Sequence, residues 1–131
     1  MRYTKWIVEA TLFALAACGS ATSYGGGGGG GGGGGPAAQI VVGNILFRSA
    51  HNGSQNPAVD TVAAGSTVTW TWTATGTIAH SVRSAATPNF TNSAIESGNG
   101  KTYSVTFNTA GTYQYDCAVH GSAMRGTIVV Q

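Results

Sequence analysis

The chain is organised around one stretch near its C-terminus, Tyr113-Gln-Tyr-Asp-Cys-Ala-Val-His-Gly-Ser-Ala-Met-Arg-Gly-Thr-Ile128. Tyr113, Tyr115 and Cys117 alternate with polar residues, and this period of two predicts a β-strand that turns the thiol inward. The β-branched run Thr127–Gln131 predicts another strand after it. The fold is therefore predicted to rest on strands, with a short connection between these two.

Three side chains with sulfur or imidazole donors lie within eight residues of one another: Cys117, His120 and Met124. Thiolate and thioether favour Cu(I), and imidazole accepts either oxidation state. Two histidines, one cysteine and a weak axial methionine form the site of blue-copper electron-transfer proteins. The second histidine must come from elsewhere. His80 is the better candidate because it follows the strongest strand pattern, whereas His51 stands in a turn-rich segment.

Alternation typical of β-strands also recurs in the rest of the chain from residue 37. Thr67–Thr73 alternates Val68, Trp70 and Trp72 with threonines, so we interpret both tryptophans as core residues. Lys101–Phe107 alternates likewise and is expected to form a hairpin with the cysteine-bearing strand. Residues 85–100 are compatible with a loop or one helical turn. Seven to eight short strands predict an all-β fold, an antiparallel Greek-key β-sandwich.

These motifs resemble those of the cupredoxins, the small plastocyanin/azurin-like blue copper proteins of bacteria. The resemblance rests on Val59–Trp70, His80–Val82 and Gly111–Gly126, and it covers residues 38–131. It implies one type 1 copper ion that cycles between Cu(I) and Cu(II), a function in one-electron transfer, and no enzymatic activity. The alternative function is a copper carrier or storage protein of the cell envelope.

The resemblance also implies a role for each metal-binding residue. His80 would be the upstream ligand, Cys117 the thiolate, His120 the solvent-edge ligand and Met124 the axial ligand. The residue after the first histidine is often Asn in this family and ties the ligand loops together, whereas Ser81 in this chain is shorter. We expect Ser81 to lie just outside the ligand set. Redox partner proteins of the envelope would dock briefly around His120, and we expect a monomer.

The first 36 residues do not resemble a domain. A basic start followed by the apolar run Ala10–Ala17 predicts a signal peptide over residues 1–17. Leu15-Ala-Ala-Cys18 resembles the lipobox of bacterial lipoproteins and implies lipidation of Cys18. Residues 18–36 include eleven consecutive glycines and predict a flexible linker to the domain at 37–131. We therefore expect a lipid-anchored protein on the periplasmic or extracytoplasmic side of the bacterial envelope.

Composition and charge exclude other interpretations. The net charge is only +2, and four scattered cations after the linker cannot form the basic stripe that nucleic acid requires. A disulfide between Cys18 and Cys117 is an alternative for the two cysteines, but the lipobox and the metal site explain each thiol separately.

Asp116 lies on the opposite strand face from Cys117 and should point away from the metal.

Overall fold

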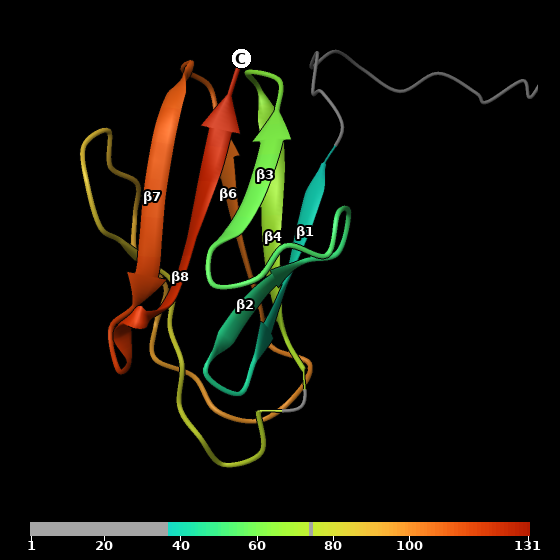
Figure 1. The fold of residues 1–131 in the computed structure, drawn as a ribbon, viewed down its shortest axis with the longest axis vertical. Coiled ribbons are helices and arrows are strands. Elements are labelled where there is room, and N and C mark those ends of the chain that lie inside the picture. Colours follow the sequence, from blue (N-terminus) through green and yellow to red (C-terminus); the bar gives the residue numbers. More distant parts are fainter. Residues whose placement is uncertain (1–36, 74) are drawn as a thin grey trace, which may run out of the picture. The chain divides into compact units, whose positions relative to one another are not determined.

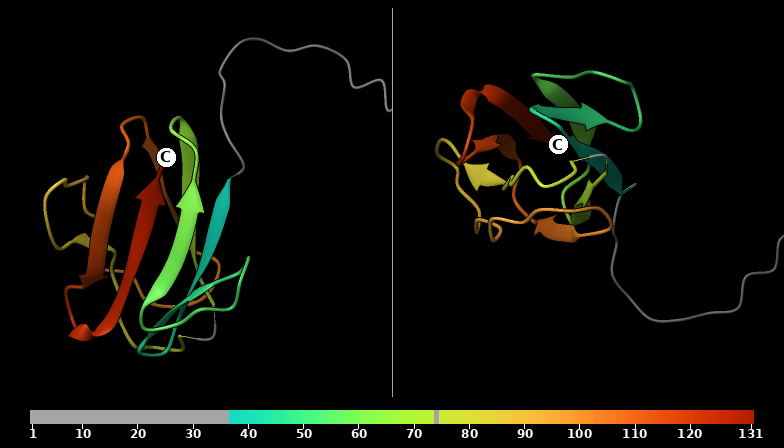
Figure 2. Two further views of the ribbon diagram at one scale, coloured as in Figure 1. Left: turned by 45° about the horizontal axis from the view of Figure 1, so that its top comes forward. Right: turned by 90° about the horizontal axis from the view of Figure 1, so that it is seen from below.

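The computed structural model describes residues 37–73 and 75–131, and these residues form eight strands without a helix. Two four-stranded sheets, with orders β2-β1-β4-β6 and β3-β8-β7-β5, face each other in a sandwich (Figures 1 and 2). The all-β sandwich predicted from the sequence is confirmed. The strands are β1 (Ala38–Gly43), β2 (Leu46–Ser49), β3 (Ala58–Val62), β4 (Ser66–Trp72), β5 (Arg83–Ser84), β6 (Thr102–Phe107), β7 (Gly111–Cys117) and β8 (Gly121–Val130).

The predicted signal peptide, the lipidation site Cys18 and the linker to residue 36 lie outside the described residues. Within the described ranges, no helix has the length and apolar character needed to cross a membrane.

Both sheets are mixed. β1 runs parallel to β4 and β3 runs parallel to β8, whereas the other strand pairings are antiparallel. A wholly antiparallel sandwich was expected, and this detail differs because alternation defines the buried face of a strand but not the direction of its neighbour. The parallel pairings join strands that are distant in the chain, so they leave no local turn signal.

The hairpin expected between residues 101–107 and the cysteine-bearing strand is wrong. β6 pairs with β4 in one sheet, whereas β7 pairs with β8 and β5 in the other. The connection Asn108–Ala110 therefore crosses between the sheets. Turn residues indicate that the chain reverses direction, but they do not indicate whether the two flanking strands pair with each other. The alternation of both strands was read correctly, since each buries one face.

Aromatic side chains join the two sheets in the core. β4 buries Val68, Trp70 and Trp72, as predicted. The Trp70 ring meets the Tyr115 ring edge to face, with centroids 5.3 Å apart. Tyr115 lies across its register partner Gly126, and a Cβ added at Gly126 would overlap the phenol ring. Gly126 is therefore needed for the close approach of the aromatic ring to the backbone of β8.

Residues 85–100 form an irregular loop, so the alternative of a helical turn is excluded for this segment. The loop is fastened beside β5, since the Val82 amide donates to Ser93 Oγ at 2.8 Å and the Ser93 amide donates to the Val82 carbonyl at 2.9 Å. Phe90 packs on Trp70 with ring centroids 6.0 Å apart. The loop thus covers one side of the core.

The two ends of the sandwich differ. The end where β7 stops and β8 starts also holds the β1–β2 turn and the connection that leaves β4 (Figure 1). The opposite end holds the start of β1 at Ala38 and the last residue of β8 (Figure 1). The described domain therefore begins at the end that does not contain Cys117 and His120.

We predict that Gly126→Ala lowers the free energy of unfolding by about 1–3 kcal/mol, measured by chemical denaturation. The added methyl group would displace the Tyr115 ring from its place between the sheets. The same substitution in a Tyr115→Leu background is the control, because leucine lacks the phenol that the methyl group meets. Equal losses in both backgrounds would contradict this account of Gly126.

Candidate metal centre

The candidate site is built where β7 ends and β8 begins. β7 ends at Cys117, a tight turn carries His120, and β8 starts at Gly121. The His120 amide donates to the Cys117 carbonyl at 3.2 Å, which closes the turn. Gly121 has φ 57°, a conformation that glycine adopts more easily than other residues, and it leads the chain from the turn into β8.

Met124 was expected on the connecting loop, but the structure includes it in β8. The pairing of β7 with β8 shifts here, because Asp116 pairs with Arg125 while Cys117 pairs with Gly121. The residues between them form an irregularity in the ladder, and such bulges re-aim side chains. Met124 is fully buried in the same core cluster as Cys117.

His80 reaches the same place from the connection after β4. The His80 amide donates to the Glu96 carbonyl and the Glu96 amide donates to the His80 carbonyl, both at 2.9 Å, so the backbone of the histidine is held on one side by the long loop. Its imidazole stands next to that of His120, with ring centroids 4.8 Å apart. The structure thus brings together the two histidines that the sequence placed forty residues apart.

Three potential donors converge on one point. Cys117 Sγ lies 3.5 Å from His120 Nδ1 and 4.0 Å from His80 Nδ1, and all three ligand atoms lie within 4.8 Å of one another. Nitrogen and sulfur bind zinc at about 2.0–2.3 Å, and donors at such lengths in a trigonal plane stand about 3.5–4.0 Å apart. The two separations from the sulfur fall in this range, and the third is at most 4.8 Å, so the group could hold one metal ion with small adjustments of the imidazoles.

Burial differs among the three donor residues. Cys117 and His80 are fully buried, whereas His120 is partly exposed. His80 Nε2 has no hydrogen-bond partner in the described part of the chain. Burial, helped by the neighbouring His120, holds the pKa of His80 below its ordinary value of 6.5. The imidazole is therefore neutral at pH 7, which is the form that binds a metal.

Ser81 fastens the histidine segment to the cysteine strand. Its amide donates to Cys117 Sγ at 3.4 Å, and its hydroxyl accepts a hydrogen bond from the Ala118 amide at 3.0 Å. The short side chain therefore does span the two ligand-bearing segments. Its backbone amide also places a donor on the sulfur, and such contacts tune a metal-bound thiolate.

The other candidate residues lie elsewhere. His51 is exposed in the β2–β3 connection and is absent from the group formed by His80, Cys117 and His120, the one such group among residues 37–73 and 75–131. Asp116 points away from the thiol, as predicted, and binds Arg83. This ion pair was not foreseen, because opposite charges far apart in a sequence give no signal of their pairing.

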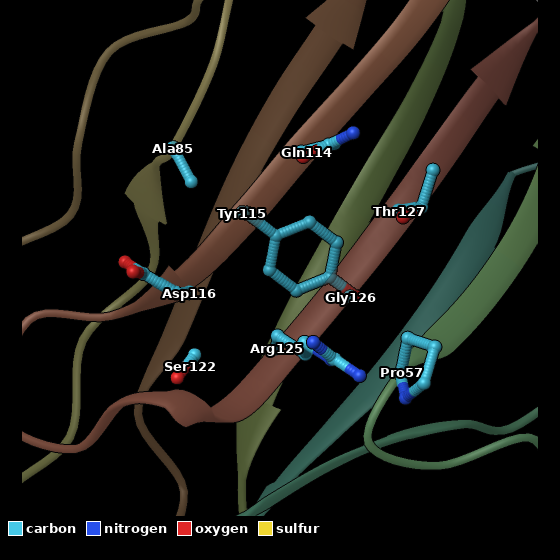
Figure 3. Close-up of a pocket in the computed structure, with 9 residues that line it drawn as sticks. All are labelled: Pro57, Ala85, Gln114, Tyr115, Asp116, Ser122, Arg125, Gly126 and Thr127. Carbon is cyan, nitrogen blue, oxygen red and sulfur yellow. The ribbon is translucent and has the colours of Figure 1, made fainter.

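The outer face of β7 and β8 carries a cavity of about 340 Å³ (Figure 3). Tyr115 and Gly126 lie at the centre of this view, and mostly polar residues surround them. Its lining residues are Pro57, Ala85, Gln114, Tyr115, Asp116, Ser122, Arg125, Gly126 and Thr127. None of the three convergent donors belongs to it, so the cavity is not part of the candidate metal centre.

Known proteins with similar sequences or structures also indicate a copper-binding protein. The family model of copper-binding proteins of the plastocyanin/azurin family matches residues 54–131. No curated protein sequence matches the chain. A solved purple cupredoxin from Nitrosopumilus maritimus is 25% identical with a TM-score of 0.56, covering 72% of this chain and 99% of that one. A methionine-to-alanine mutant of amicyanin in the Cu(I) form is 26% identical with a TM-score of 0.55, covering 72% and 82%.

We predict that the metal-free protein loses stability as the pH falls below 6.5, the ordinary pKa of histidine. His80 takes up a proton more readily in the unfolded chain than in the folded one, so acid favours unfolding. The free energy of unfolding should therefore fall more steeply from pH 7 to pH 5 in the wild type than in His80→Gln. Denaturant titrations at each pH measure this, and equal slopes would refute the prediction.

Proposed function

The chain belongs to the plastocyanin/azurin family of copper-binding proteins, and from this we propose that it transfers single electrons through one type 1 copper ion. The proposed ligands are His80, Cys117, His120 and Met124. Electron transfer is the function that the family and the donor geometry support best.

One observation carries the proposal: a fully buried thiol lies 3.5 and 4.0 Å from the nitrogens of two adjacent imidazoles. A trigonal set of one cysteine and two histidines is the plane of a blue-copper site. Met124, buried four residues after His120, is the thioether available for the weak axial contact. The donor set thus suits copper in both oxidation states.

When bound, copper supplies a one-electron couple between Cu(II) and Cu(I). The surrounding residues keep the donors in one arrangement in either state. Cys117 is the last residue of β7, Ser81 bonds to both its sulfur and the following amide, and the Glu96 backbone holds His80. Because these donors are held by protein contacts, little has to move when an electron enters or leaves.

A copper carrier or storage protein is the alternative, and the burial of the site argues against it. A carrier has to release its ion readily to another protein. Cys117, His80 and Met124 are fully buried here, and only His120 among the four proposed ligands is partly exposed. Such a site favours retention of the ion, and it leaves one ligand edge through which electrons can pass.

We propose no enzymatic role. The copper enzymes built from this fold, the multicopper oxidases and nitrite reductases, need a second copper centre with further histidines. The chain has three histidines in all, and two of them belong to the proposed site. His51 alone remains, and one imidazole cannot build a second centre.

Docking of a redox partner is proposed at the end that carries His120. Four large apolar residues that are 39–60% exposed stand on the β1–β2 turn, the connection after β4, the β7–β8 turn and the loop position next to Glu96, whose backbone pairs with that of His80. These residues are Ile45, Ile78, Ile95 and Val119. Exposed apolar surface of this kind favours contact with another protein. With so few charges in the chain, the contact would be apolar and brief.

We further propose that the protein is anchored in the bacterial envelope through lipid on Cys18. The support is the lipobox-like Leu15-Ala-Ala-Cys18 after an apolar run. Stable anchoring requires two or more acyl chains, at about 0.8 kcal/mol per buried CH2.

We predict that the protein loaded with Cu(II) shows an intense thiolate-to-copper absorption band in the visible spectrum. Only a short bond between copper and a cysteine thiolate gives such a band in a trigonal site. Cys117→Ser should abolish the band, because the hydroxyl cannot replace the thiolate. A wild-type protein that holds copper tightly without colour would refute the type 1 site.

Met124→Leu is the matched variant for this experiment. Leucine keeps the volume of the buried side chain and removes the weak donor. The band should therefore persist while the reduction potential rises, with about 59 mV for each tenfold change in the relative stability of Cu(I) and Cu(II). Loss of copper from Met124→Leu would show that the thioether is more than an axial contact.

We predict that Cys18→Ser moves the protein from the membrane fraction to the soluble fraction, or leaves its signal peptide uncleaved. The substituted residue cannot accept the lipid. Fractionation of bacteria that express each form, followed by mass measurement of the N-terminus, tests this. Wild-type protein that is soluble and unmodified at residue 18 would disprove the anchor.

A further inference from the structure

An ion pair crosses from β5 to β7 on the outer face of the sheet. Arg83 Nε donates to Asp116 Oδ1 and Arg83 Nη2 donates to Asp116 Oδ2, both at 2.8 Å. The two residues are also register partners in the short ladder between these strands. In Figure 3 the Asp116 carboxylate points away from Gly126, toward the β5 side of the sheet. The pair is thus a two-bond fork between adjacent strands.

The position of this pair relates it to the donors. Asp116 immediately precedes Cys117, and Arg83 follows His80 by three residues. β5 has only two residues, so the backbone ladder that holds this segment against β7 is short. Ser81 fastens the same two segments on the inner side of the sheet. Arg83 and Asp116 fasten them on the outer side, next to the residues that carry the imidazole and the thiol.

We propose that Arg83 and Asp116 are positioning residues that fix the separation of His80 Nδ1 from Cys117 Sγ, now 4.0 Å. The inference rests on the proposed function, because this separation matters for a metal held between the two atoms. An exposed ion pair contributes little to overall stability. A forked guanidinium–carboxylate pair does fix orientation, however, since two parallel hydrogen bonds restrict rotation of both groups.

A second ion pair offers a matched control. Lys101 Nζ lies 3.6 Å from Glu96 Oε2, a single contact between side chains that are 54% and 40% exposed. The Asp116 side chain, by comparison, is only 15% exposed. Glu96 also neighbours the histidine segment, because its backbone pairs with that of His80. The control pair therefore has the same charges near the same segment but lacks the fork.

The experiment separates geometry from charge with four variants of the full chain. Arg83→Lys keeps the charge and loses the fork, and Arg83→Gln with Asp116→Asn removes both charges together. Lys101→Gln with Glu96→Gln is the control. Asp116→Asn alone completes the set. Amide hydrogen exchange at Ser81 and Ala118 is measured in the copper-free protein, and the absorption band and reduction potential are measured after loading with Cu(II).

If the pair positions the donors, Arg83→Lys and the Arg83/Asp116 double variant both exchange the two amides about two- to fivefold faster than the wild type. Both also shift the thiolate-to-copper band, and the Lys101/Glu96 control changes neither readout. The proposal is overturned if Arg83→Lys and the double variant match the wild type while Asp116→Asn alone moves the potential, because that pattern reports charge only. Equal effects from the control pair would overturn it too.

The type 1 copper site and the positioning role of the Arg83–Asp116 pair can be refuted independently. A wild-type protein without a thiolate-to-copper band would refute the type 1 copper site. The amide exchange rates of the copper-free variants would still decide whether the Arg83–Asp116 pair holds the two segments together.

Discussion

The contact between Ser81 and the end of β7 is the constraint on which the rest of the site depends. The Ser81 amide donates to a fully buried sulfur at 3.4 Å, and the Ser81 hydroxyl accepts from Ala118 at 3.0 Å. Leaving such buried groups unpaired costs about 1–3 kcal/mol each. The pairing therefore holds together two segments that are 36 residues apart in the chain. These protein contacts set where the donors lie.

The core carries that arrangement into the rest of the domain. Tyr115 lies two residues before Cys117 on the same face of β7, and Trp70 and Phe47 hold its ring from the other sheet. Gly126 opens the space that the ring occupies on β8. Because protein interiors are close-packed, a displaced ring would move the strand that ends in the thiol. The geometry of the donors thus depends on how the two sheets pack.

The sequence predicted what depends on local pattern. Alternation around Trp70 and Tyr115 located the buried faces, and the spacing of Cys117 and His120 indicated the donor set. The pairing of strands that are distant in the chain was not predictable. The strand expected at residues 101–107 pairs with β4 and forms no hairpin with β7, and two other pairings are parallel. Met124 was placed on a loop because a register shift inside a strand leaves no mark in the sequence. The Arg83–Asp116 ion pair was not predicted for a similar reason, since the two residues become neighbours only in the folded sheet.

The domain begins at Ala38, at the end of the sandwich opposite His120 (Figure 1). The seven residues of β7 alone span about 20 Å, so the entry of the chain and the partly exposed imidazole stand roughly that far apart. A support coupled directly to Ala38, without the predicted linker, would therefore hold the domain with its partly exposed histidine facing outward. On an electrode, attachment at that end would place the donors far from the conducting surface, whereas contact through the apolar residues around His120 would bring them close to it. The same molecule would then report fast or slow current depending only on which end is immobilised.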